Sequence, residues 1–338
     1  MGVRGMTLGE RTDPDISPQS GSRRIRWVGV AAVIVVAALA VGGIVLSRPR
    51  PSQPLVAPTT ARSVPTTAPA PVAERLTWAP PRLATPITLA IGPDIHELRL
   101  EAGQDYLLVL PRNPLLLAGE LVINGGRNVV LIGGEIVVPS IADAPDPHDR
   151  RGLLLKGQTG TVHIEGLRIS GAGLSEGIDI DQRDGAVVQL ENIAIATVHG
   201  SRATNHADVV QVWAGPAQLL IDGLTGTTEY QGLFLLPDQF LSKPPESYDL
   251  RRIVITSAQS GPTGGAGYLL WTTDSTPWLS VSDVVLVDPR ADLRGMVRPF
   301  SAWEQGVRLQ SDSVGVRLPR GTPGVSYSSP GYVTQGEM

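Results

Sequence analysis

The chain has 338 residues and a formal net charge of −4, and it contains 38 glycines, 29 prolines and no cysteine. The near-neutral charge argues against a general nucleic-acid-binding surface, and the lack of cysteine excludes disulfides, cysteine zinc sites and a thiol nucleophile. So many glycines and prolines favour an all-β fold with frequent tight turns over a bundle of long helices.

The N-terminal region predicts a tail followed by a membrane anchor. Residues 1–26 are polar and are expected to form a disordered cytoplasmic tail. Trp27–Leu46 contains 20 residues without a charge, enough to cross about 30 Å of hydrocarbon, so a single transmembrane helix is predicted over residues 27–47. More arginines precede this segment than follow it, which predicts a cytoplasmic N-terminus. A cleaved signal peptide is the alternative, but the apolar run is longer than such peptides carry.

Residues 48–86 are rich in proline, threonine and alanine and are predicted to be an extended linker. A linker of this kind after a membrane anchor suits a spacer through a bacterial cell envelope. The expected location is therefore the cell membrane, with a single pass and the folded domain outside the cytoplasm.

The folded domain is predicted over residues 87–316, followed by an irregular C-terminal tail over 317–338. Its first strands are expected at residues 87–91, 95–100 and 106–110, with a further pair within 115–123 and 129–138. These strands are expected to close the N-terminal end of a repeating structure.

A short phrase recurs through the domain and reads apolar, polar, Gly or Asn, apolar, with looser later copies. Its copies begin at Ile164, Leu190, Ile221, Leu250 and Val281, which lie 26, 31, 29 and 31 residues apart. A companion apolar strand precedes each copy by about a dozen residues. A period of this length is typical of a solenoid.

The segments Asn128–Ile136, Thr161–Ser170 and Val187–Ala196 resemble rungs of a right-handed parallel β-helix of the pectate-lyase-like superfamily. The resemblance implies that the chain coils once per repeat and stacks inward apolar residues into ladders. The Gly and Asn positions suit bends that need a positive φ. Leucine-rich repeats and a β-sandwich fit the pattern less well, because a Leu framework is missing and sandwiches do not repeat one inner phrase.

Alternation along the companion strands sorts their side chains, with Ile178 and Ile180 taken as inward. The outward positions are then expected to stack into three columns. The first column is Arg151, Glu176, Asp208 and Gln231, the second is Leu154, Asp179, Gln211, Phe234 and Leu269, and the third is Lys156, Asp181, Trp213, Leu236 and Trp271.

This outward face combines carboxylates with aromatic rings. Paired carboxylates serve glycoside hydrolysis as acid and base or nucleophile, and tryptophan rings offer flat surfaces to sugars. The candidate catalytic residues are Asp208, Glu176, Asp179, Asp181 and His206. The candidate substrate-binding residues are Gln211, Trp213, Gln231, Tyr230, Trp271, Lys156 and Arg151. The alternative is a solvated polar face with a weak Lys156–Asp181 ion pair.

The resemblance carries the fold but no catalytic signature. Polygalacturonase-like motifs are matched only in part, by Asp179-Ile180-Asp181, His199-Gly200 and Arg252-Ile253-Val254. No cofactor is predicted, although Asp179, Asp181 and Asp208 offer oxygen ligands for Ca²⁺.

The sequence thus predicts a membrane-anchored, extracytoplasmic β-helix protein that acts on carbohydrate, as a polysaccharide lyase or a glycoside hydrolase. A non-catalytic envelope protein that binds a glycan or another protein is the alternative. The expected partners are a polysaccharide and the membrane, and not nucleic acid.

Overall fold

The computed structural model describes residues 75–140, 150–258, 267–290, 292–312 and 322–333. The chain divides into compact units at residues 1–66 and 67–338, and all described residues belong to the second unit. The predicted cytoplasmic tail, the transmembrane helix and most of the predicted linker lie outside the described residues. Within the described part, no helix is both long and apolar enough to cross a membrane.

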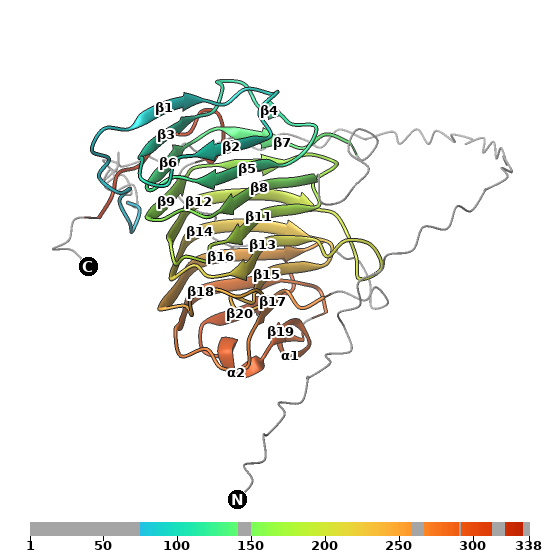
Figure 1. Ribbon diagram of the computed structural model, residues 1–338. Coiled ribbons are helices and arrows are strands. Elements are labelled where there is room, and N and C mark those ends of the chain that lie inside the picture. The colour runs from blue at the N-terminus through green and yellow to red at the C-terminus, as the bar shows by residue number, and fades with distance from the viewer. Residues whose placement is uncertain (1–74, 141–149, 259–266, 291, 313–321, 334–338) are drawn as a thin grey trace, which may run out of the picture. The chain divides into compact units, whose positions relative to one another are not determined.

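In the described part of the chain, twenty strands build two sheets (Figure 1). The twelve-stranded sheet contains β1 (Ile87–Ala90), β3 (Tyr106–Val109), β4 (Leu115–Leu116), β6 (Val129–Ile132), β7 (Glu135–Val137), β9 (Thr161–Glu165), β10 (Arg168–Ser170), β12 (Val187–Val198), β14 (Gln218–Thr228), β16 (Ser247–Ser257), β18 (Leu279–Val287) and β20 (Val307–Gln310). The eight-stranded sheet contains β2 (Glu97–Leu100), β5 (Leu121–Gly125), β8 (Arg151–Lys156), β11 (Glu176–Asp181), β13 (Asp208–Ala214), β15 (Gln231–Leu235), β17 (Leu270–Thr272) and β19 (Val297–Arg298).

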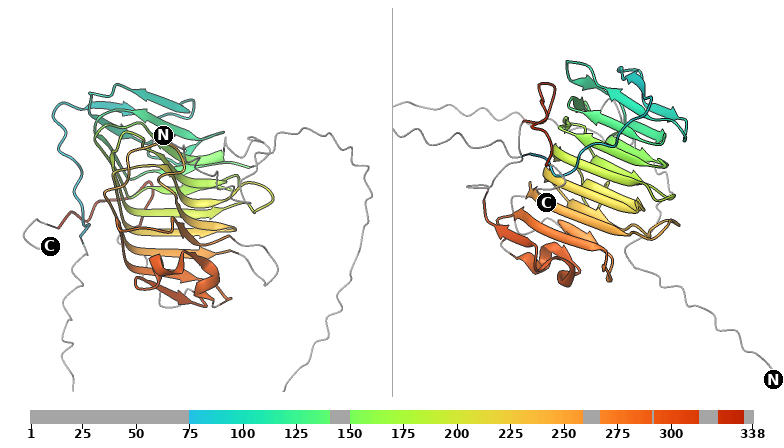
Figure 2. Two further views of the ribbon diagram at one scale, coloured as in Figure 1. Left: turned by 60° about the horizontal axis from the view of Figure 1, so that its bottom comes forward. Right: turned by 90° about the vertical axis from the view of Figure 1, so that its left-hand side faces the viewer.

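Successive coils of the chain contribute in turn to each sheet, and the strands stack along one axis (Figures 1 and 2). The paired strands run parallel, as β12 does with both β9 and β14. Strands stacked in this way must be joined by connections that pass round the coil, which is the definition of a parallel β-solenoid. The predicted all-β parallel β-helix architecture is therefore confirmed.

The recurring phrase aligns from coil to coil as predicted. Its first apolar residues form one ladder in register: Ile164, Leu190, Ile221, Leu250 and Val281. Its third position has a positive φ in every copy, at Gly166, Asn192, Gly223, Arg252 and Asp283. Only glycine takes this backbone conformation without cost, and Asn and Asp tolerate it better than most residues. The phrase therefore fixes the bend that turns each coil.

The C-terminal end of the core is covered by two single-turn helices, α1 (Leu293–Met296) and α2 (Phe300–Trp303). Met296 and Trp303 are fully buried there and belong to the same apolar cluster as the solenoid interior. The Trp303 indole N–H donates to the carbonyl oxygen of Arg298 at 3.2 Å, so its polar atom is satisfied inside the core. These helices therefore shield the C-terminal end of the apolar core from solvent.

Both ends of the described unit meet on the outer face of the twelve-stranded sheet (Figure 2). Residues 75–78 and 322–333 form what we call the terminal straps. Leu76 pairs with Tyr332, with hydrogen bonds from the Leu76 N–H to the Gly331 oxygen and from the Val333 N–H to the Leu76 oxygen, both at 2.9 Å. The straps therefore hold each other as well as the sheet.

The straps bind carboxylates at the second position of the phrase. Backbone N–H groups of Thr77 and Trp78 donate to the two oxygens of Glu191, at 2.9 and 2.7 Å. The hydroxyls of Tyr327 and Tyr332 donate to the two oxygens of Glu165. The phrase is thus scaffold, as expected, and its acidic position additionally fastens the two straps.

Candidate functional site

One outward column runs along most of the eight-stranded sheet. Paired strands place these residues side by side in order: Leu154, Asp179, Gln211, Phe234, Trp271 and Arg298. The central part, from Asp179 to Phe234, agrees with the second predicted column. The next residue does not, because Trp271 lies beside Phe234 where Leu269 was expected.

Strand β17 therefore pairs two residues away from the predicted register. Leu270, and not Tyr268, lies beside Leu233. A slip of two residues keeps each side chain on its face but changes its neighbours, because side chains alternate with period two. Trp271 is consequently outward, as predicted, but stands in the second column and not in the third.

The third predicted column is also interrupted, by an irregularity in β13. The register shifts after Ile180, so that Asp181 pairs with Ala214 and not with Trp213. Bulges of this kind re-aim side chains. The Trp213 ring here lies against the Arg151 guanidinium, whose central carbon is 4.9 Å from the ring centroid.

Arg151 is the centre of a buried ion cluster. Its Nε lies 2.5 Å from Oε2 of Glu176 and 2.6 Å from Oδ2 of Asp179, and its Nη1 lies 3.3 Å from Oε2 of Glu120. With the Trp213 ring on top, the guanidinium is almost shielded from water, and 11% of the Arg151 side chain is exposed. One cation thus faces three carboxylates in a low-dielectric site, where such interactions are strong.

The two neighbouring aspartates are driven towards their neutral forms. Burial and then the negative charge of Glu176 raise the pKa of Asp179 well above its ordinary value, and Arg151 opposes this shift. Burial and Glu176 also raise the pKa of Asp208. Burial disfavours the charged form of each aspartate, and the negative charge of Glu176 disfavours a second negative charge beside it. The site therefore holds two aspartates, Asp179 and Asp208, whose neutral forms are favoured more than in an exposed aspartate.

Several oxygens in this region lack a hydrogen-bond donor among the described residues. They are buried, and they include both carboxyl oxygens of Asp208 and the amide oxygens of Gln211 and Gln231. Leaving a buried acceptor unpaired costs roughly 1–3 kcal/mol, so such groups are rare in folded proteins. They cluster here on adjacent strands β13 and β15.

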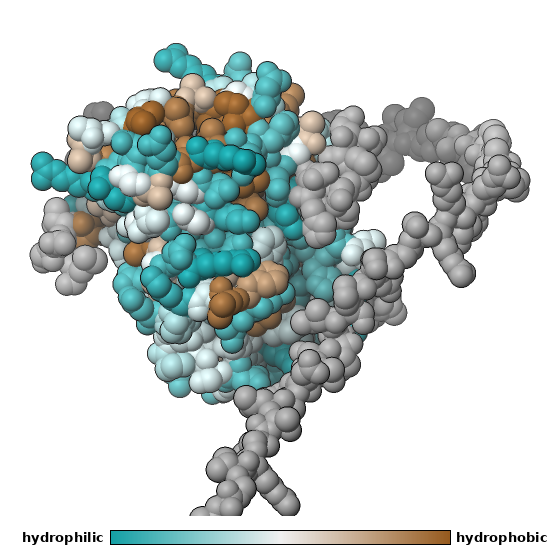
Figure 3. Space-filling view, viewed as in Figure 1, coloured by the Kyte–Doolittle hydropathy of each residue, from teal (hydrophilic) through white to brown (hydrophobic). Residues whose placement is uncertain are grey.

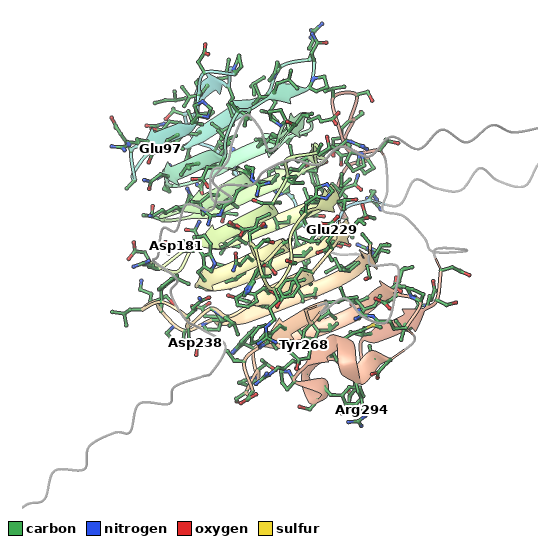
Figure 4. The ribbon with its side chains drawn as sticks, turned by 90° about the vertical axis from the view of Figure 1, so that its right-hand side faces the viewer. Glu97, Asp181, Glu229, Asp238, Tyr268 and Arg294 are labelled. Atoms are coloured by element: carbon green, nitrogen blue, oxygen red, sulfur yellow. The ribbon has the colours of Figure 1, made fainter. Side chains whose placement is uncertain are left out.

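Aromatic rings continue the column towards the C-terminal helices. Trp271 meets Phe234 edge-on with ring centroids 5.1 Å apart, and Tyr268 lies 5.7 Å from Trp271. The Arg298 guanidinium lies 5.5 Å from the Trp271 centroid and 5.8 Å from that of Tyr268. We call Phe234, Tyr268, Trp271 and Arg298 the aromatic row. Figure 4 labels Tyr268, near the C-terminal end of the solenoid that also carries Arg294.

The remaining predicted residues lie around this column. His206 is exposed and packs on the ring of Tyr230, with centroids 5.0 Å apart. Neither carboxyl oxygen of Asp208 has a hydrogen-bond partner among the described residues, so the candidate catalytic residues His206 and Asp208 do not form a hydrogen-bonded pair. Asp181 lies 4.0 Å from Nζ of Lys156, as the solvated-face alternative expected, but its closer cation is Arg183 at 2.8 Å.

Three members of the site were not predicted: Glu120, Tyr268 and Arg298. Glu120 precedes the regular repeats, and Tyr268 lies two residues before the inward Leu270, so alternation along the strand predicts an inward position for it. Arg298 follows the last copy of the phrase, where no repeat marks its strand. A correct alignment of β19 would have placed Arg298 beside Trp271.

Metal binding receives no geometric support from the described residues, which contain no group of three or more His, Asp or Glu side chains placed to hold an ion.

No family model, curated protein or solved structure matches this chain. Its function must therefore be argued from the site itself.

Proposed function

We propose that this protein binds a polysaccharide along the outward face of its eight-stranded sheet. The observation that carries the proposal is the aromatic row, in which Phe234, Trp271 and Arg298 lie in register on adjacent strands. Tyr268 and Trp271 remain partly exposed on this face. Sugar rings present apolar faces and hydroxyl edges, and partly exposed aromatic rings beside polar groups complement both.

The geometry of the column suits a linear polymer. Neighbouring strands lie about 4.8 Å apart, so three steps from Gln211 to Arg298 span roughly 14 Å along the solenoid axis. That length accommodates more than one sugar ring. Gln211, next to Phe234, places a polar side chain at the inner end of the aromatic row, where sugar hydroxyls need partners.

A glycan array with the full chain tests this proposal, followed by affinity measurements on the best ligand. Trp271→Ala should weaken binding about tenfold, which corresponds to ~1.4 kcal/mol. Phe240→Ala is the matched control, because Phe240 is an exposed aromatic residue outside the column. Binding that survives Trp271→Ala unchanged, or no binding to any glycan, would count against the aromatic row.

A second function, polysaccharide cleavage, is favoured by the raised pKa of Asp208. Glycoside hydrolysis needs one protonated carboxyl and one ionised carboxylate. In this scheme Asp208 donates the proton, and the second carboxyl group is that of Glu176, which pairs with Arg151. Incubation with the bound polysaccharide should release shorter chains, and Asp208→Asn should abolish release but leave binding intact. Equal release by both proteins would contradict this role.

Membrane anchorage and an extracytoplasmic location form part of the same proposal. They are supported by the 20 uncharged residues Trp27–Leu46 and by the proline-rich segment that follows. The full chain should fractionate with membranes, and deletion of residues 27–47 should release it. A shortened mature N-terminus would instead indicate a cleaved signal peptide. Membership of the pectate-lyase-like superfamily, with its right-handed coil, stays a prediction from resemblance.

A further inference from the structure

The two ends of the solenoid differ in whether other elements cover them. Helices α1 and α2 cover the C-terminal end, but the N-terminal end presents strands β1 and β2, each paired on one side only among the described residues. Figure 3 shows apolar surface gathered near these strands, at the top of the view. The exposed large apolar side chains of this end are Ile87, Val109, Leu116 and Ile132.

An open edge of this kind is a template for further pairing, because its outer N–H and C=O groups have no strand partner. Natural proteins blunt such edges with charged side chains, proline or a covering element. Strand β1 carries no charge, and Leu89, Leu98 and Leu100 are only partly buried although they pack on the main core. The first rung of the core is thus left partly open to solvent.

The charges on β2 are complementary to a second copy of the same strand. Glu97 and Arg99 flank Leu98 and form an exposed ion pair at 2.8 Å, in which 82% of the Arg99 side chain remains accessible. In an antiparallel pair centred on Leu98, Glu97 of each copy stands opposite Arg99 of the other. Opposite charges directly across an antiparallel pair are stabilising, and like charges there are destabilising.

We propose that two copies of this chain associate head to head through their N-terminal ends, with β2 pairing antiparallel to β2 of the second copy about a two-fold axis at Leu98. This contact is isologous, so it closes at a dimer and adds no further copies. It covers Leu98 and Leu100 and pairs the free edge of β2. Charge self-complementarity favours a second copy over any other occupant.

Charge exchange on β2 tests the proposal with the full chain, by sedimentation over a wide dilution series. The wild type should be a dimer that dissociates on dilution. Glu97→Arg alone and Arg99→Glu alone each place like charges across the axis and should weaken dimerisation at least tenfold. The double variant Glu97→Arg/Arg99→Glu restores opposite charges and should recover it. Arg308→Glu is the control, because it breaks an exposed ion pair on the other sheet and should change nothing.

Cross-linking tests the position of the axis independently of electrostatics. The chain has no cysteine, so in Leu98→Cys every disulfide joins position 98 of one copy to position 98 of another. Rapid oxidation to a covalent dimer is expected. Three results would each overturn the proposal. They are a monomer at all concentrations, single charge variants that dimerise as strongly as the wild type, and open-ended polymers. A chain that dimerises only after its first 66 residues are removed would show that its own N-terminal segment is the occupant, which also overturns it.

Discussion

Glu191, the carboxylate that fastens residues 77 and 78, allows a sharp test of how the terminal straps are held. Burial raises its pKa to about 8, although the backbone N–H groups of Trp78 and Thr77 favour the ionised form. The folded state therefore keeps a proton that the unfolded chain releases near pH 4.5. Stability from this group is complete below that pH and is lost as the pH rises towards 8.

The expected magnitude follows from the same shift. Each pH unit in this window costs about 1.4 kcal/mol, so ionisation of Glu191 in the unfolded chain lowers the free energy of unfolding by roughly 3 kcal/mol at pH 7. Glu191→Gln removes that loss but also replaces one acceptor oxygen by a donor facing a backbone N–H, which costs about 1–3 kcal/mol. The two effects nearly cancel at pH 7, and the pH dependence separates them.

Urea denaturation between pH 5 and 7.5 is the assay. The wild type should lose stability with rising pH more steeply than Glu191→Gln, by up to about 1.4 kcal/mol per pH unit. Glu246→Gln, an exposed carboxylate on a loop, should leave the wild-type slope unchanged. Parallel slopes for wild type and Glu191→Gln would refute the assigned protonation. A slope of opposite sign would mean that the hydrogen bonds outweigh burial.

Three further changes test the ion cluster, the C-terminal cap and the bend. Arg151→Ala leaves Glu176 and Asp179 without their buried cation and should lower stability by about 3–5 kcal/mol at pH 7, and by less at pH 4, in urea denaturation. Trp303→Ala should cost about 3–5 kcal/mol in the same assay, because it empties the cap of the core. Asp283 has a φ of 52°, so Asp283→Gly should melt higher than Asp283→Ala, by ~1 kcal/mol in stability; equal melting temperatures would contradict the bend.

The sequence predicts the architecture because every coil repeats the same physical requirement. An apolar residue must enter the core at each rung, and the third phrase position must turn with a positive φ. Gly166, Asn192 and Gly223 are residue types that tolerate this positive φ. The later copies contain Arg252 and Asp283, and their φ values are positive too, at 51° and 52°. There the ladder on either side imposes the conformation, so the looser pattern still predicts the right bend.

The candidate site is less predictable because it depends on register and not on pattern. Gly267 looks like the equivalent of Gly232, and aligning them displaces Trp271 from its observed neighbour Phe234. The shift in β13 likewise separates Trp213 from Asp181. The terminal straps have no periodicity at all. Their places are fixed by hydrogen bonds to buried acids far away in the chain, as from Tyr327 to Glu165.

Buried outward acids differ in how well their oxygens are satisfied, and the contrast between Asp208 and the pair Glu165 and Glu191 favours a function for the eight-stranded face. On the twelve-stranded sheet, Glu165 and Glu191 each have donors at both carboxyl oxygens, supplied by the terminal straps. On the eight-stranded sheet, Asp208 is just as deeply buried, yet neither of its oxygens has a donor among the described residues. The donors to Glu165 and Glu191 show that this fold can pair both oxygens of a buried outward acid. Keeping unpaired acceptors beside an aromatic row costs stability, and sites that bind or transform a ligand are where such a cost is usually found.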